Sequence, residues 1–249
     1  ERGATAVALI DPQAKATYLF EATPHLPRQL YKLEQQAKDF ALSGVFLTHA
    51  HIGHYAGLMF FGHESMGASN VPVFAMPRMM DYLGTNGPWS QLVAYNNIAL
   101  RPLAHNRTEN LSGLGVTPFL VPHRDEFSET VGYSIQGPNK TALFIPDINK
   151  WSVWERDIAE VIKTVDYALL DATFFGAGEL PGRDMSRVPH PLVTETMAAL
   201  AGLGPEQRKK VWFIHMNHTN PLLDPKSEEA MLVRAAGYNI ATEATRLDL

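Results

Sequence analysis

Three histidines stand close together in residues 48–58, which read Thr-His-Ala-His-Ile-Gly-His-Tyr-Ala-Gly-Leu. His49, His51 and His54 form an H-x-H-x-x-H cluster directly after the apolar, strand-like run 45–47. Two histidines at i and i+2 on a turn that leaves a strand can point their imidazoles at one position. The third, at the start of the next helix, can face a second position nearby. Because neutral imidazole is the commonest side-chain ligand for zinc and iron, this turn predicts a metal site, with chance clustering as the alternative.

Four further polar residues each follow an apolar run that is typical of a β-strand. They are His123 after 117–121, Asp147 after 142–145, Asp171 after 167–170 and His215 after 211–214. In layered α/β proteins, reactive groups collect at the carboxyl ends of strands, because the sheet fixes their positions and the loops leave room for a ligand. Any one of the four, taken alone, is more simply a capping or turn residue. Together with the histidine cluster, they indicate one metal site.

The order of these residues resembles the metallo-β-lactamase superfamily, in which H-x-H-x-x-H is followed by a lone His, an Asp at a strand end and a late His. Four segments also resemble the pyrroloquinoline quinone biosynthesis protein B group within it: FEATPHLPRQL (20–30), VPVFAMP (71–77), LDATF (170–174) and IHMNHTNPL (214–222). Ribonuclease Z-type phosphodiesterases share part of the pattern. The resemblance spans nearly the whole chain and implies an α/β fold, an αββα sandwich of two similar halves with metals in a cleft at one edge.

The resemblance also implies how zinc is held, with iron or manganese as alternative metals. A first metal would take three histidines, and a bridging carboxylate would connect it to a second metal held by two more histidines; in this order the ligands are His49, His51 and His123, then Asp147, then His54 and His215. Most hydrolytic members have Asp at the position of Gly53, as H-x-H-x-D-H. Glycine supplies no ligand, so we expect the second metal to bind weakly or to be missing.

A proton donor away from the metals is predicted from the segment after residue 170. In ribonuclease Z relatives, a carboxylate in an E-A-T-F-like segment orients a downstream histidine that protonates the leaving oxygen. Here Asp171 opens Asp-Ala-Thr-Phe, and His190 follows just before an expected helix. A carboxylate bonded to one imidazole nitrogen fixes the tautomer and raises the pKa, so the other nitrogen can deliver a proton. With the bridging Asp147, these two residues are the candidate catalytic groups; the alternative is that His190 only caps the helix.

The elements that must position these residues alternate along one expected domain, 1–249. Strands are expected at 5–10, 17–21, 45–48, 71–75, 117–121, 131–135, 142–146, 167–170 and 211–215, and helices at 29–41, 55–64, 151–163, 192–203 and 226–236. Such alternation indicates an α/β architecture. We expect residues 78–113 to be an insert of helix and loop over the cleft, and the loops 78–113 and 176–190 to shape the substrate pocket.

Composition narrows the class of protein. A chain of 249 residues with 45% hydrophobic content can bury the core of one large α/β unit. No apolar run approaches the roughly 18 residues that cross a bilayer. A formal net charge of −5 argues against a broad nucleic-acid-binding face, and the lack of cysteine excludes thiolate ligands and disulfides. The chain begins at Glu1 and enters a strand almost at once, whereas the resembling family usually has an earlier strand, so we expect an N-terminal piece to be missing.

These observations favour a metal-dependent hydrolase that acts on a small anionic ester, above all a phosphodiester, through a metal-activated hydroxide. One alternative is an iron-dependent oxidoreductase of the quinone-cofactor-biosynthesis type, and another is a non-catalytic metal-binding relative that has changed at Gly53. We expect a small anionic partner, no structured nucleic acid and no membrane. The sequence leaves the compartment open between a bacterial-type cytoplasm and periplasm, and it leaves the oligomeric state open, a dimer included.

Overall fold

The computed structural model describes residues 3–249, which form two compact units. Unit 1 comprises residues 3–107 and 125–131, and unit 2 comprises residues 108–124 and 132–249. Each unit is built on one β-sheet with helices packed against it, so the expected α/β class with two sheets is confirmed. No helix within residues 3–249 combines the length and apolarity needed to cross a membrane.

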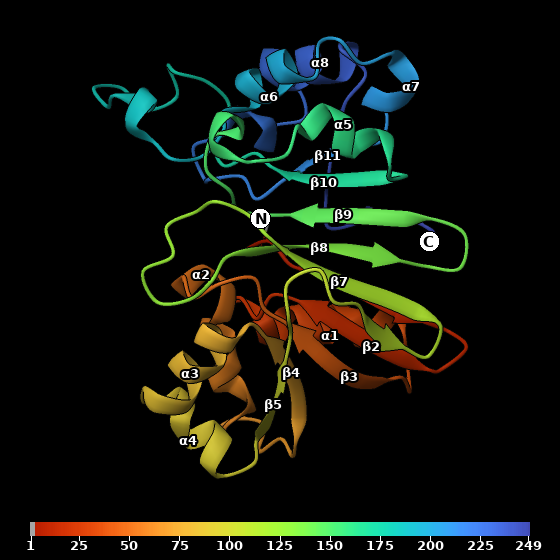
Figure 1. The fold of residues 1–249 in the computed structure, drawn as a ribbon, viewed down its shortest axis with the longest axis vertical. Helices are drawn as coiled ribbons and strands as arrows, with labels where there is room; N and C mark the ends of the chain where they lie inside the picture. The colour runs from red at the N-terminus through yellow and green to blue at the C-terminus, as the bar shows by residue number, and fades with distance from the viewer. Residues whose placement is uncertain (1–2) are drawn as a thin grey trace. The chain divides into compact units, whose positions relative to one another are not determined.

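The sheet of unit 1 has the strand order β1-β2-β3-β4-β5 (Figure 1). Strand β1 (Val7–Asp11) pairs antiparallel with β2 (Ala16–Phe20), and β3 (Ala41–Phe46), β4 (Val71–Ala75) and β5 (Ile98–Pro102) continue the sheet in parallel. The helices α1 (Leu26–Gln36), α3 (Pro77–Thr85) and α4 (Trp89–Ala94) bury apolar side chains in the same core as β3 and β4. Parallel pairing places the carboxyl ends of β2, β3 and β4 at one edge of this sheet.

A column of stacked phenylalanines sets the register of that edge. Phe20, Phe46 and Phe74 are partners across β2, β3 and β4. Their ring centroids are 5.0 Å apart for Phe20 and Phe46 and 4.4 Å apart for Phe46 and Phe74. Such cross-strand pairs of buried side chains hold neighbouring strands in a single alignment. The turn that follows Phe46 therefore begins level with the residue that follows Phe20.

The sheet of unit 2 has the strand order β12-β11-β10-β9-β8-β7-β6. Strands β9 (Thr141–Ile145), β10 (Tyr167–Asp171), β11 (Val211–Ile214) and β12 (Asn239–Ile240) are parallel, β8 (Val131–Gln136) is antiparallel to β9, and β6 (Glu109–Leu111) and β7 (Leu114–Leu120) form a hairpin. Figure 1 shows α5 (Ile158–Lys163), α6 (Val193–Ala199) and α8 (Glu228–Ala235) on one side of β10 and β11, with α7 (Pro205–Arg208) nearby. Since β9, β10 and β11 are parallel, their carboxyl ends also meet at one edge.

The expected helix at 55–64 is helical only to residue 61 and is not a continuous α-helix. Helix α2 (Ile52–Tyr55) ends after one turn, and a 3₁₀ helix, η1 (Ala56–Phe61), follows it. The cause is a close approach to the turn after β2: the Gly57 N–H donates to the Ala22 carbonyl instead of continuing the α-helical ladder. A Cβ on Gly57 would lie 2.1 Å from the carbonyl oxygen of Thr23, so only glycine fits here.

The expectation of helix and loop throughout 78–113 is also wrong, because β5 and β6 lie in that stretch. Strand β5 is the edge strand of the unit 1 sheet, paired with β4. The Arg101-Pro102 pair ends β5, and an edge strand tolerates proline because one side of its backbone has no partner. Within 151–163, α5 begins only at Ile158, since the Asp157 side chain caps it by accepting from the Ala159 N–H.

Candidate metal centre

The three histidines of the H-x-H-x-x-H turn lie against one another in unit 1. His49 Nε2 is 2.8 Å from His51 Nδ1, and the ring centroids of His49 and His54 are 4.2 Å apart. His49 and His54 are buried, and His51 is half-buried. The turn is held in place because the Ala50 N–H donates to the Ser128 hydroxyl. The structure thus brings together the three side chains that the spacing predicted to face two neighbouring positions.

The outer ring nitrogens of the first two histidines contact polar neighbours. Thr48 Oγ1 lies 2.8 Å from His49 Nδ1, and Glu126 Oε2 lies 3.2 Å from His51 Nε2. Metal-binding histidines use one nitrogen for the metal and the other for such a partner, which fixes the tautomer and the ring orientation. His49 Nε2 and His51 Nδ1, which face each other, are the nitrogens that this arrangement presents to a metal.

Glu21, to which the sequence analysis assigned no role, supports the third histidine. Its carboxylate is fully buried, and Oε2 lies 3.4 Å from His54 Nδ1. The backbone of Glu21 has a φ of +85°, a strained value for a residue with a side chain. Its N–H donates to the Phe46 carbonyl, and the N–H of Ala22 donates to the His54 carbonyl, which ties this turn to the histidine turn. The sequence did contain a signal for Glu21, because it is an acidic residue directly after an apolar strand. The same kind of signal identified Asp171.

Unit 2 collects the other predicted residues at the carboxyl edge of its sheet. His123 Nε2 lies 3.3 Å from Asp147 Oδ2, and His190 Nδ1 lies 3.1 Å from Asp147 Oδ1 and 2.9 Å from Asp171 Oδ2. Asp147, Asp171 and His190 offer ligand atoms that lie within 4.8 Å of one another. His123 Nδ1 faces the side-chain oxygen of Asn149 at 3.2 Å, a partner that the sequence analysis missed.

His215 is held at the end of β11 by an unusual backbone conformation. Its φ is +59°, in the left-handed region that residues with side chains seldom adopt. Thr173 Oγ1 lies 2.9 Å from His215 Nδ1, and Asp171 Oδ1 lies 3.6 Å from the same nitrogen. The second ring nitrogen of His215 is therefore the one presented to a ligand. Strained residues that the surrounding structure holds in place are a recurring feature of functional sites.

The predicted contact between Asp171 and His190 is present. Burial by itself raises the pKa of Asp171, but the charge of His190 and hydrogen bonds from His190 and His215 outweigh it and hold this pKa at about 2. Burial by itself lowers the pKa of His190, but Asp171 and Asp147 outweigh it and raise this pKa to about 10. The two shifts agree on one state, an aspartate paired with an imidazolium.

The alternative reading of His190 as a helix cap is wrong. Helix α6 begins at Val193, with Leu192 as its N-cap residue. The Leu192 N–H donates to Glu195 Oε2 at 2.8 Å, so the helix supplies its own acceptor. The His190 side chain instead contacts the two carboxylates and the hydroxyl of Thr173.

Gly53 has room for the carboxylate that it lacks. It is exposed, and a Cβ built there meets no heavy atom within 4 Å. We predict that Gly53→Asp raises the affinity for a second metal about tenfold or more, since even outer-shell partners of metal ligands change affinity by that much. Calorimetric titration with zinc measures this affinity, and Gly53→Asn is the uncharged control. Two equally tight metals in the unmodified protein would show that Gly53 leaves no ligand position to fill.

Comparisons with known proteins agree with this geometry. Residues 9–216 match the family model described as Beta-lactamase superfamily domain. The Coenzyme PQQ synthesis protein B of Methylobacterium sp. (strain 4-46) is 26% identical over 267 residues, which cover 96% of this chain and 86% of that protein. The crystal structure of Zn²⁺-bound PqqB from Methylobacterium extorquens has a TM-score of 0.80 at 25% identity and covers 98% of this chain and 87% of that one. A diphosphatase of the PhnP family has a TM-score of 0.63 at 18% identity, covers 96% of this chain and 81% of that one, and shares the fold.

The donor set of the chain fits the zinc seen in the PqqB relative. Imidazoles with polar partners on their outer nitrogens, together with buried carboxylates, are the ligands that zinc takes where cysteine is absent. The donor residues of this chain and the zinc of the PqqB relative therefore both support the expectation of a zinc-type site. The family match over residues 9–216, the two-sheet α/β fold and the histidines and aspartates at the strand ends together show that the chain belongs to the metallo-β-lactamase superfamily and is similar to the PqqB group within it.

Proposed function

We propose that the chain is a metal-dependent hydrolase of a small anionic ester, with phosphodiesters as the substrate class. The observation that carries this proposal is the setting of His190. Its Nδ1 contacts two buried carboxylates and the Thr173 hydroxyl, while its side chain remains 12% exposed and lines a pocket. Nε2 is therefore the nitrogen that a ligand can meet. Ester hydrolysis needs a proton donor for the leaving oxygen, whereas a site that only stores a metal does not.

We propose further which residues would hold the metals. His49, His51 and His123 would be ligands of a first metal, His54 and His215 would be ligands of a second, and Asp147 would supply a carboxylate. Membership of the superfamily and the zinc of the PqqB relative support this assignment. When bound, such a metal acts as a Lewis acid and lowers the pKa of a water molecule toward 7.

The chain's own residues then move one proton. Asp171 and Thr173 hold Nδ1 of His190, which fixes the orientation of the ring. Nε2 donates its proton to the leaving oxygen as the ester bond breaks, so that the product leaves as a neutral alcohol. Asp171 stays ionised during the reaction, and it stabilises the imidazolium form of His190 before the proton is transferred.

A role in coenzyme synthesis is the second candidate. It is favoured by the relatives named Coenzyme PQQ synthesis protein B, which are similar to this chain over 96% of its length. An iron-dependent oxidoreductase would use the same histidines, since imidazole suits iron as well as zinc. Such an enzyme consumes oxygen, whereas a hydrolase does not.

A panel of assays on one preparation tests the proposal. Protein purified without added metal is analysed for metal content and then assayed on bis(4-nitrophenyl) phosphate, a carboxylic ester and a β-lactam. We expect release of nitrophenolate from the phosphodiester, its loss on chelation and its recovery with zinc. Oxygen uptake without hydrolysis would favour the oxidoreductase, and full metal content without any turnover would favour a non-catalytic relative. Tight, salt-sensitive binding of structured RNA would contradict the small-substrate proposal.

A further inference from the structure

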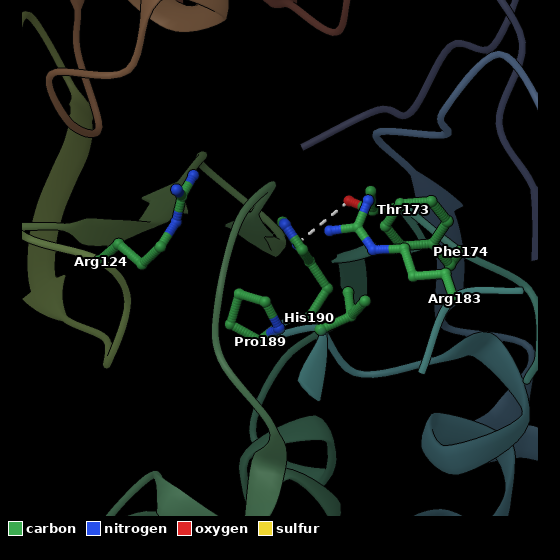
Figure 2. A pocket seen from close by; sticks show the side chains of 7 residues that line it. Arg124, Thr173, Phe174, Arg183, Pro189 and His190 are labelled. Atoms are coloured by element: carbon green, nitrogen blue, oxygen red, sulfur yellow. Dashed lines mark hydrogen bonds between the residues drawn. The ribbon is translucent and has the colours of Figure 1, made fainter. Parts of the chain in front are cut away.

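A small pocket beside His190 contains two arginines that the proposed hydrolysis does not use. It lies in unit 2, has a volume of about 230 Å³, and its walls include Arg124 and Arg183 (Figure 2). Sites that enclose a whole small molecule usually measure roughly 300–1,000 Å³. A cavity of this size therefore accommodates one part of a ligand whose remainder lies elsewhere.

Arg124 and Arg183 bring positive charge to the lining of the pocket. Figure 2 shows Arg124 on one side of His190 and Arg183 on the other. Within residues 3–249, none of the residues that line the pocket is acidic. None of the described residues accepts a hydrogen bond from the Arg183 guanidinium, so its donors can serve a ligand. Guanidinium groups stay ionised at any ordinary pH and match carboxylate and phosphate oxygens with two parallel hydrogen bonds.

Three of the other residues that line the pocket are apolar. Phe174, Val188 and Pro189 line the pocket, and the first two pack in a small buried cluster with Met185 and Leu192. The ring of Phe174 meets that of His190 edge to face, with centroids 6.2 Å apart. Cations beside an aromatic wall suit an anion attached to an apolar or aromatic group.

Hydrogen bonds hold the segment that carries Arg183 in place on both sides of this residue. Before it, Glu179 Oε2 accepts from the Phe175 N–H at 2.6 Å, and Glu179 Oε1 accepts from the Thr219 hydroxyl. After it, Asp184 caps the 3₁₀ helix η3 (Met185–Arg187) by accepting from the Ser186 N–H. Arg183 therefore has a defined place in the wall of the pocket.

We propose that Arg124 and Arg183 bind a second anionic group of the substrate. This group is a carboxylate or a phosphate, joined through a short apolar or aromatic linker to the ester that reacts beside His190. The proposal rests on the proposed hydrolase function and names its substrate class: an ester that carries a second negative charge away from the bond that breaks. The two arginines then determine specificity and take no part in the proton transfer.

A matched pair of substrates tests this specificity. Phenyl 4-nitrophenyl phosphate and its analogue with a carboxylate on the phenyl ring release the same nitrophenolate. We expect kcat/KM of the unmodified protein to be about 10- to 100-fold higher for the carboxylated ester, the range for a hydrogen bond to a charged group. In Arg183→Gln and Arg124→Gln this ratio should fall toward 1, mainly through KM. Arg187→Gln is the control, because Arg187 is an exposed arginine of the same segment that does not line the pocket.

A binding measurement separates this proposal from the proposed function. Calorimetric titrations with benzoate and with phenylphosphonate distinguish a carboxylate from a phosphate site and need no turnover. We expect one of the two anions to bind, and Arg183→Gln and Arg124→Gln to weaken it at least about tenfold, with Arg187→Gln unaffected. If neither ester is hydrolysed but this pattern appears, the hydrolase is wrong and the anion site stands. Equal binding by all variants, or an equal loss in Arg187→Gln, would overturn the anion site.

Discussion

Replacing His49 by alanine should remove the first metal and all metal-dependent hydrolysis. His49 Nε2 and His51 Nδ1 face each other at 2.8 Å, and a site left with two imidazoles does not complete the coordination of zinc. A ligand held at 1,000 times its Kd stabilises the folded state by about 4 kcal/mol, and the variant should lose that contribution. Metal content by mass spectrometry and thermal unfolding with and without a chelator measure the two effects.

The same experiment tests whether His49 and His123 hold one metal. His123→Ala, in unit 2, should cause the same loss of metal as His49→Ala, and the double variant should be no worse than either single one, because residues that act together are not additive. His63→Ala is the control, since His63 is an exposed histidine of unit 1 outside the histidine turn. Retention of stoichiometric zinc by either single variant, or simple addition of the two losses, would show that these histidines do not hold one metal.

Replacing His190 by alanine should lower turnover by roughly 10² to 10⁴, the usual contribution of a general acid, and leave the metal content intact. The loss should shrink for nitrophenolate esters, whose leaving groups need no proton, and should be largest for alkyl esters. Asp171→Asn should show a milder version of the same pattern, because it removes the charge that pairs with His190 but keeps the shape. Steady-state kinetics on a series of leaving groups measures this dependence.

Two results would remove His190 from the mechanism. One is an equal loss of activity on good and poor leaving groups, which would indicate a role in binding or stability. The other is a loss of metal, which would indicate that His190 is a ligand, since it forms a group with Asp147 and Asp171 whose ligand atoms lie within 4.8 Å. Metal analysis of His190→Ala distinguishes these two cases directly.

Much of the candidate site could be predicted from local sequence. Apolar β runs are short-range patterns, and a polar residue at the end of each is visible without any tertiary information. Because parallel strands share a carboxyl edge, Asp147, Asp171 and His215 had to lie near one another once β9, β10 and β11 paired. The H-x-H-x-x-H spacing likewise placed His49 and His51 together, because one turn determines both positions.

Other features depend on contacts between residues that are far apart in the chain. Glu21 reaches His54 only because β2 and β3 pair in register and because Gly57 lets the histidine helix approach the turn after β2. Strand β5 escaped prediction because the Arg101-Pro102 pair at its end resembles a loop sequence, and its place at the sheet edge is decided by the order of strands.

The pocket beside His190 shows most clearly the difference between what local sequence predicts and what the tertiary structure decides. Arg124 and Arg183 stand in separate loops far apart in the chain, so nothing in the sequence pairs them. Folding of unit 2 places both around one pocket with Phe174 and His190. The sequence by itself determined the metal chemistry, because ligand types and their positions at strand ends are local properties. Only the tertiary structure decided which distant charges surround the reacting group, because that depends on how the loops pack at the edge of the sheet.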